Sequence, residues 1–105
     1  MNWQDLTVEV VGIEGVCPVY RLGDRFRLEQ GYKIVTQDSC NVCLHSLGSI
    51  QTWAVALSAG VRPEDCGLAQ AGGDTAYVRC LDPGPPLTPG GTVTFAIRRE
   101  PPRQA

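Results

Sequence analysis

Five cysteines are the residues of this chain best suited to chemistry. They are Cys17, Cys40, Cys43, Cys66 and Cys80. An odd number of cysteines cannot pair completely within one chain, so the count disfavours a disulfide framework. In a reducing compartment, cysteines this frequent serve metal binding or thiol redox chemistry, or they are inert buried residues.

Two of the cysteines, Cys40 and Cys43, form a C-x-x-C pair, the usual first half of a zinc or iron–sulfur site. We expect a helix from about residue 41 to 59, introduced by the capping residues Asp38 and Ser39. The pair would then bracket the first helical turn, where free amides and the helix dipole favour a thiolate. The same spacing suits a redox pair that forms a reversible disulfide. A second C-x-x-C pair is absent from the sequence, so a zinc ribbon is not indicated.

The remaining cysteines lie at the boundaries of expected elements. Pro18 keeps Cys17 out of the helical region, so Cys17 belongs to a loop. Cys80 comes at the end of an expected strand, directly before a proline-rich turn. Loops at the ends of a sheet commonly carry binding sites, and scattered thiolates suit an iron–sulfur cluster at least as well as zinc. Cys66 lies in a polar turn and is expected to be incidental.

The single histidine, His45, is expected at the surface. On a helix that begins near residue 41, a separation of two residues places it about 200° round from Cys43. The aspartates at positions 24, 65, 74 and 82 fall in turns, where local backbone bonding is their usual role. The sequence shows neither a Ser/His/Asp arrangement nor a phosphate-binding glycine loop.

Apolar periodicity predicts the elements that position these residues. Alternating residues predict strands over 6–13, 25–28, 75–81 and 92–97, with 32–35 as an extension. The helix carries one apolar stripe, formed by Cys43, Leu47, Ile50, Ala54 and Leu57, and Gly60 suits its C-terminus. The order predicts an α+β fold in which a small antiparallel or mixed sheet of four to five strands packs against one long helix. We expect a single domain over 1–99 and a flexible C-terminal tail over 100–105.

Composition limits the classes of partner. The chain has 105 residues, 43% of them hydrophobic, and a formal net charge of −2. A nucleic-acid partner or an anionic membrane surface would require a concentration of basic residues, so neither is expected. The N-terminus lacks the pattern of a signal peptide, and no apolar run approaches the ~20 residues of a membrane span. We therefore expect a cytoplasmic protein with reduced thiols.

Three segments carry a resemblance to a known family: 15–26 (GVCPVYRLGDRF), 42–47 (VCLHSL) and 80–86 (CLDPGPP). They resemble a small uncharacterised prokaryotic family whose members have a similar length. These proteins share a Cys-Pro loop, a cysteine at the start of the helix and a late cysteine followed by an Asp-containing turn. The resemblance extends roughly from Leu6 to Arg99, and it implies no particular reaction.

The resemblance divides the five cysteines into two groups. Cys17, Cys43 and Cys80 match the family pattern, whereas Cys40 and Cys66 are additional. This implies a three-cysteine site for an iron–sulfur cluster, most simply [4Fe–4S] with one iron open for redox or small-molecule chemistry, or for zinc. Cys40 or His45 is a candidate fourth ligand. Two alternatives remain: an accessory or interaction domain with buried free cysteines and no cofactor, and a thiol redox protein that uses Cys40 and Cys43.

Overall fold

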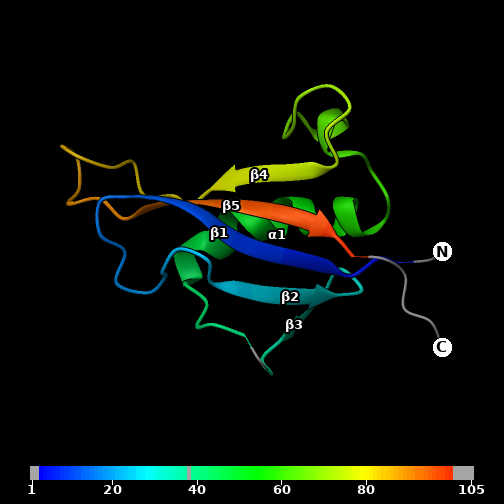
Figure 1. Cartoon of the computed structure of the whole chain (residues 1–105), viewed down its shortest axis with the longest axis horizontal. Helices are drawn as coiled ribbons and strands as arrows, with labels where there is room; N and C mark the ends of the chain where they lie inside the picture. Colours follow the sequence, from blue (N-terminus) through cyan, green and yellow to red (C-terminus); the bar gives the residue numbers. More distant parts are fainter. Residues whose placement is uncertain (1–2, 38, 101–105) are drawn as a thin grey trace.

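A computed structural model describes residues 3–37 and 39–100. The elements in chain order are β1 (Leu6–Glu14), β2 (Arg25–Glu29), β3 (Lys33–Val35), α1 (Leu44–Ser58), the 3-10 helix η1 (Pro63–Cys66), β4 (Thr75–Arg79) and β5 (Thr92–Arg99). The strands form one sheet in the order β3-β2-β1-β5-β4, and every neighbouring pair is antiparallel (Figure 1). The predicted α+β class is confirmed, although α1, with 15 residues, is of ordinary length.

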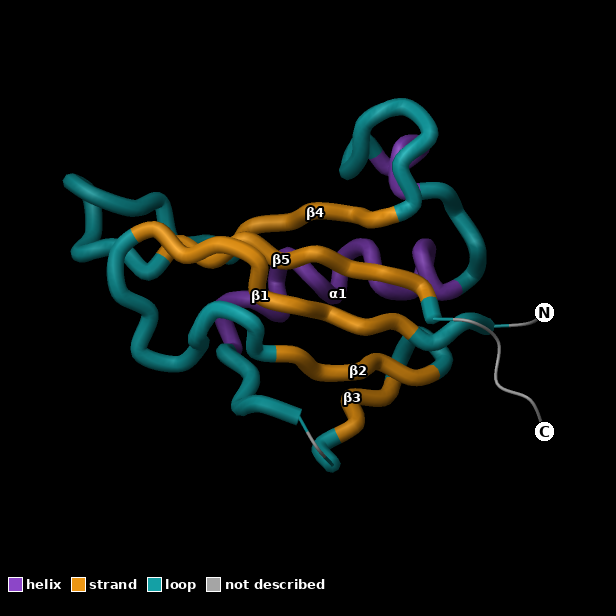
Figure 2. Tube along the Cα trace, viewed as in Figure 1, coloured by secondary structure: helices purple, strands orange, loops and turns teal. Residues whose placement is uncertain are grey.

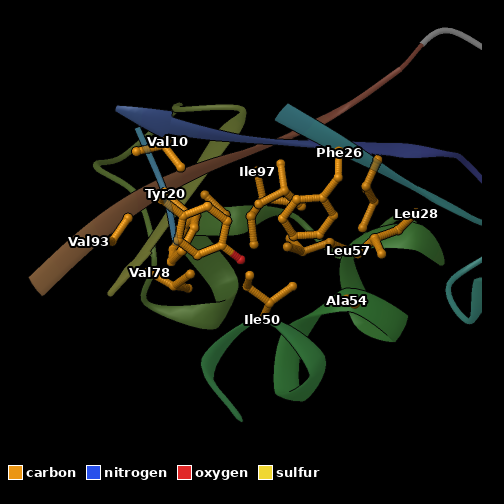
Figure 3. Packing of buried hydrophobic residues seen from close by; sticks show 14 residues of the cluster. Val10, Tyr20, Phe26, Leu28, Ile50, Ala54, Leu57, Val78, Val93 and Ile97 are labelled. Carbon is orange, nitrogen blue, oxygen red and sulfur yellow. The ribbon is translucent and has the colours of Figure 1, made fainter. Parts of the chain in front are cut away.

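The hydrophobic core lies between the sheet and α1, which covers one face of the sheet (Figure 2). The buried apolar residues of β1 alternate along the strand, as a sheet with one covered face requires. The core is completed by Phe26, Leu28, Phe95 and Ile97 from the sheet and by Ile50, Ala54 and Leu57 from the helix (Figure 3). Burial of this apolar surface is the main source of stability for the scaffold.

A β-bulge interrupts the pairing of the central strand with β5. Val10 pairs with Phe95, whereas the next paired residue is Gly12, which faces Thr94. Val11 is the extra residue and is 39% exposed. Because the bulge shifts the alternation by one residue and increases the bend, the end of β1 turns into the loop that carries Cys17.

The beginning of the helix differs from the prediction. Helix α1 starts at Leu44, and Cys43 is its N-cap residue with an extended backbone. Ser39 donates a hydrogen bond to the carbonyl of Val35 rather than to the helix, and Asp38 lies outside the described residues. The prediction that Cys40 and Cys43 bracket the first helical turn is therefore wrong.

The apolar stripe and the end of the helix follow the prediction more closely. Ile50, Ala54 and Leu57 are buried, while Leu47 and Cys43 are half-buried. The amide of Gly60 donates to the carbonyl of Leu57 (3.1 Å), and the amide of Val61 donates to that of Ala56 (3.0 Å). Together with the left-handed backbone of Gly60 (φ 100°), these bonds form a Schellman motif.

Two strand boundaries bear on the site and on the chain end. Strand β4 ends at Arg79, so Cys80 lies just beyond the observed strand, although the predicted strand, 75–81, included it. The amide of Glu100 donates to the carbonyl of Asp5 (2.8 Å), and its carboxylate pairs with Arg27 (3.1 Å). The first residue of the expected tail is thus held against the sheet, while 101–105 lie outside the described residues. Within the described part of the chain, no helix is long and apolar enough to cross a membrane.

Charged residues on the sheet face opposite α1 are paired with one another. Arg79 contacts Glu14 (2.6 Å), and Arg98 contacts Glu9 (2.6 Å). Arg27 contacts three carboxylates: Asp5 and Glu100, both at 3.1 Å, and Glu29 at 3.8 Å. Each of these three arginines is therefore paired with at least one carboxylate.

Candidate cysteine site

Cys17, Cys43 and Cys80 line one pocket of about 320 Å³. They come from the loop after β1, the N-cap of α1 and the residue after β4, and all three are half-buried free thiols. The other lining residues are Pro18, Val19, Tyr20, His45, Asp82, Gly90, Gly91 and Val93. The loops that follow β1 and β4 lie together at one end of the sheet (Figure 1).

Cys17 is held in a tight turn by a contact to its sulfur. The amide of Tyr20 donates to Cys17 Sγ at 3.3 Å. The intervening Pro18 fixes the backbone and offers no amide of its own. An amide hydrogen directed at a cysteine sulfur is a contact that tunes metal-bound sulfurs in proteins.

Cys80 is held across from the start of β5 in a similar way. Its backbone amide donates to the carbonyl of Val93 (2.9 Å), which extends the pairing of β4 and β5 by one residue. The amide of Val93 donates in turn to Cys80 Sγ at 3.2 Å, and the thiol donates to the carbonyl of Gly91 at 3.6 Å. Two of the three pocket sulfurs therefore accept a backbone hydrogen bond.

Cys43 is fixed through its backbone by a distant tyrosine. The amide of Cys43 donates to the hydroxyl of Tyr20 at 2.9 Å, and Ser46 Oγ donates to the carbonyl of Cys43 at 2.7 Å. The Tyr20 hydroxyl lies 2.8 Å from Ser46 Oγ, so it donates there while it accepts from Cys43. Burial raises the pKa of Tyr20, which keeps this hydroxyl protonated and able to donate.

Tyr20 was not predicted as a site residue, yet it links two of the cysteines. Its amide contacts Cys17, its hydroxyl contacts Cys43, and its ring packs edge-on against Phe95 with centroids 5.3 Å apart. Figure 3 shows the ring within the core and its hydroxyl directed toward the helix. The only sequence signal is an aromatic hydroxyl three residues after a cysteine, and the contact with Cys43 spans 23 residues.

Glycines allow the two pocket loops to touch through their backbones. Gly91 has a φ of 94°, and a Cβ built there would lie 2.7 Å from the carbonyl oxygen of Val16 and 3.2 Å from Cys17 Cα. Gly15 has a φ of 81°, and its Cβ would lie 2.8 Å from the amide nitrogen of Gly91. The amide of Gly91 also donates to the carbonyl of Glu14 (2.8 Å). Glycine is therefore required for the Cys17 loop to approach the start of β5.

Asp82 organises the turn that follows Cys80. Its Oδ1 accepts hydrogen bonds from the amide of Gly84 (2.7 Å) and the hydroxyl of Thr88, and its carbonyl accepts one from Thr92 Oγ1 (3.1 Å). The bond from Thr88, the bond from Gly84 and the proximity of His45 hold the pKa of Asp82 below its ordinary value. The side chain is therefore a carboxylate that keeps the turn folded beside the pocket.

His45 lies at the pocket rather than on the far side from Cys43. The expectation assumed that both residues are helical, but Cys43 has an extended backbone and the spacing of 100° per residue begins only after it. The imidazole is exposed, as predicted, and it lines the same pocket as the three cysteines. The later start of α1 accounts for the difference.

Cys40 and Cys66 do not line this pocket. The amide of Cys40 donates to the carbonyl of Arg25 (3.1 Å), and its half-buried side chain packs against the core. Burial, assisted by the nearby carboxylate of Asp24, raises the pKa of the Cys40 thiol. Cys66 ends η1 and also packs against the core.

The donors in the pocket are soft, but they do not converge on a single point. Among residues 3–37 and 39–100, no group of three or more histidine, cysteine, aspartate or glutamate side chains is arranged to hold a metal ion. Zinc would require its ligand atoms to lie about 2.0–2.3 Å from one centre.

Comparisons with models of protein families, with curated proteins and with solved structures find no match to this chain. The function therefore has to be inferred from the pocket itself.

Proposed function

We propose that the protein binds an iron–sulfur cluster, [4Fe–4S], through the thiolates of Cys17, Cys43 and Cys80. The observation that carries the proposal is that these three cysteines line one pocket, whereas Cys40 and Cys66 do not. Thiolates are the usual ligands of such clusters. The resemblance noted in the sequence sorts the five cysteines in the same way.

The surroundings of the sulfurs fit a cluster. Backbone amides contact Cys17 Sγ at 3.3 Å and Cys80 Sγ at 3.2 Å, and hydrogen bonds to sulfur are one of the ways in which a protein tunes a cluster. The apolar side chains of Val19 and Val93 also line the pocket, and an apolar wall beside a metal group influences its reduction potential. When bound, a cluster of this type supplies one-electron transfer or a Lewis-acidic iron.

Zinc is the second metal candidate. The pocket has the thiol donors that zinc prefers. Among the described residues, no three histidine, cysteine, aspartate or glutamate side chains are arranged to hold a metal ion, which is an argument against a single zinc ion.

A non-enzymatic accessory or interaction domain is the second candidate function. It is supported by the packing of all five cysteines against the hydrophobic core, which is how inert thiols behave. This candidate predicts a metal-free folded protein whose stability is the same with and without a chelator.

A thiol redox protein that uses Cys40 and Cys43 is the third candidate, and the structure gives it less support. The reactive form of cysteine is the thiolate, and the raised pKa of Cys40 disfavours that form. This candidate predicts a reversible disulfide that is lost in Cys40→Ser.

The test is to purify the untagged protein without oxygen, reconstitute it with iron and sulfide, and measure iron, zinc and acid-labile sulfide per chain. We expect equal amounts of iron and sulfide, about four of each, with the visible absorption of a cluster. Cys17→Ser, Cys43→Ser and Cys80→Ser should each lose most of the cluster. Cys40→Ser and Cys66→Ser are the matched controls and should retain it.

Two results would overturn the proposal. A folded, colourless protein that also fails reconstitution would favour the accessory domain with free cysteines. Stoichiometric zinc without sulfide would instead assign the same pocket to zinc.

A further inference from the structure

Three cysteines leave the fourth corner of a cubane cluster without a thiolate. The other side chains in the pocket that can ligate a metal through nitrogen or a carboxylate are His45 and Asp82. Asp82 Oδ1 already accepts hydrogen bonds from Gly84 and Thr88 and holds the turn in place. The imidazole of His45 makes no hydrogen bond with residues 3–37 and 39–100, so its ring nitrogens are available.

We infer that His45 is the fourth ligand, so that the pocket holds the cluster through three cysteine sulfurs and one imidazole nitrogen. This inference rests on the proposed function. Imidazole is an established iron ligand in protein clusters, and nitrogen suits iron better here than a carboxylate engaged elsewhere. Cys40, the other candidate fourth ligand, does not line the pocket.

The backbone of His45 is well placed for this role. His45 is the second residue of α1, and the start of that helix is fixed by the bonds of Cys43 with Tyr20 and Ser46. The imidazole is exposed at the pocket, so rotation about its two side-chain torsions can turn the ring without moving the backbone.

A carboxylate lies in the same pocket lining as His45. It belongs to Asp82, and Gly84 and Thr88 hold it in place. Metal-bound histidines commonly donate their second ring N–H to a carboxylate, which fixes the orientation of the ring.

The chain contains a single histidine, which makes a direct test possible. Untagged protein is prepared with natural-abundance histidine and with ¹⁵N-histidine, then reconstituted with iron and sulfide and reduced. Pulsed electron paramagnetic resonance should detect a nitrogen coupled to the cluster, and its signal should change on labelling because no other histidine is present. The coupling should disappear in His45→Ala and persist in Gln51→Ala, a control on the exposed side of the same helix.

A second variant tests the ligand by its electronic effect. Replacement of an imidazole by a thiolate lowers the reduction potential of a cluster, so reconstituted His45→Cys should have a lower potential than the wild type. The same iron and sulfide content in both proteins would show that the variant holds an intact cluster, and an unchanged potential would then contradict ligation by His45.

The outcomes separate this inference from the proposal on which it rests. A reconstituted cluster without histidine coupling would overturn the assignment of His45 and leave the three-cysteine site standing. Failure of the wild-type protein to bind any cluster would overturn the proposed function, and with it the role of His45.

Discussion

The hydroxyl of Tyr20 replaces the side-chain cap that α1 lacks. Cys43 provides no capping hydrogen bond from its own side chain, and the first amide before the helix is satisfied by Tyr20 at 2.9 Å. Ser46 adds a bond to the carbonyl of Cys43. The loop that carries Cys17 and Tyr20 therefore positions the N-terminus of the helix. Tyr20 links Cys17 to Cys43 through its amide and its hydroxyl.

Tyr20→Phe should destabilise the protein by about 1–3 kcal/mol, because it leaves the amide of Cys43 without its buried partner. Urea unfolding of the cluster-free protein measures the change. Tyr32→Phe is the control: the Tyr32 hydroxyl donates a hydrogen bond to Gln30, but the side chain is 78% exposed. Equal effects of the two substitutions would contradict the role of the buried hydroxyl.

Asp82 should make the stability depend on pH in the acid range. The folded protein holds the pKa of Asp82 below its ordinary value. The carboxylate therefore stabilises the fold fully at pH values above the ordinary pKa of the unfolded chain. This contribution is lost as the pH falls through the folded pKa. The stability advantage of the wild type over Asp82→Asn should therefore be present at neutral pH and shrink on acidification.

Unfolding in urea at a series of pH values from about 6 to about 2.5 measures this advantage. Asp74→Asn is a suitable control, since the one hydrogen bond of Asp74 is a long 3.5 Å contact with its neighbour Thr75. A wild-type advantage over Asp82→Asn that stays constant with pH would show that ionisation of Asp82 does not support the turn.

At the scale of elements, the contact between the Cys17 loop and the start of β5 depends on Gly91. An alanine there would strain a backbone with φ 94° and place its Cβ 2.7 Å from the carbonyl oxygen of Val16. We expect Gly91→Ala to cost about 2 kcal/mol or more and to expose Cys17 to alkylating reagents. Thermal unfolding and the rate of Cys17 alkylation measure the two effects.

Gly72→Ala is the matched control for this substitution. Gly72 also has a positive φ, 79°, but a Cβ there meets no atom within 4 Å. It should therefore show only the backbone strain, about 1–2 kcal/mol, with unchanged alkylation of Cys17. If the two variants behaved alike, close packing of the loops would not be what positions Cys17.

The strands could be predicted from the sequence because each buries one face. Residues such as Phe26 and Leu28 alternate with charged neighbours, and the observed strand agrees within one residue of the expected one. The end of the helix at Gly60 could be predicted as well, because the left-handed backbone of a C-terminal Schellman motif favours glycine at that one position. Local patterns thus established the element types and most of their boundaries.

The start of the helix could not be predicted in this way. Asp38 and Ser39 look like a cap, but the amide of Cys43 is satisfied by Tyr20, which lies 23 residues earlier. A contact of that range leaves no periodic trace in the sequence. The early helix start also explains the wrong prediction for His45. A helix from residue 41 directs His45 away from Cys43, whereas the observed helix starts at Leu44 and His45 lines the pocket.

At the scale of the whole molecule, the core forms without help from the cysteines. Its fully buried large side chains, Phe26, Phe95, Leu6, Ile50, Leu57 and Ile97 among them, come from the sheet and α1. The pocket cysteines are only half-buried at one end of this core. A cluster would therefore bind to a scaffold that is already folded.

The cluster-free protein should consequently unfold in one cooperative transition, unlike a zinc finger, which is unfolded without its metal. Cluster binding should raise the midpoint temperature, because a ligand of the native state stabilises that state. Circular dichroism of chelator-treated and reconstituted protein tests both expectations. A chelator-treated protein without native secondary structure would show instead that the bound group is structural.

The hydrogen bond between Glu100 and Asp5 has a practical consequence for experiments on this protein. It brings the two ends of the described chain together at the end of the sheet opposite the pocket loops (Figure 1). A tether introduced beside either residue would attach the molecule to an electrode with its cysteine pocket facing the solution. Electron exchange through such a film would then have to cross the length of the sheet, whereas added small molecules would reach the pocket unhindered.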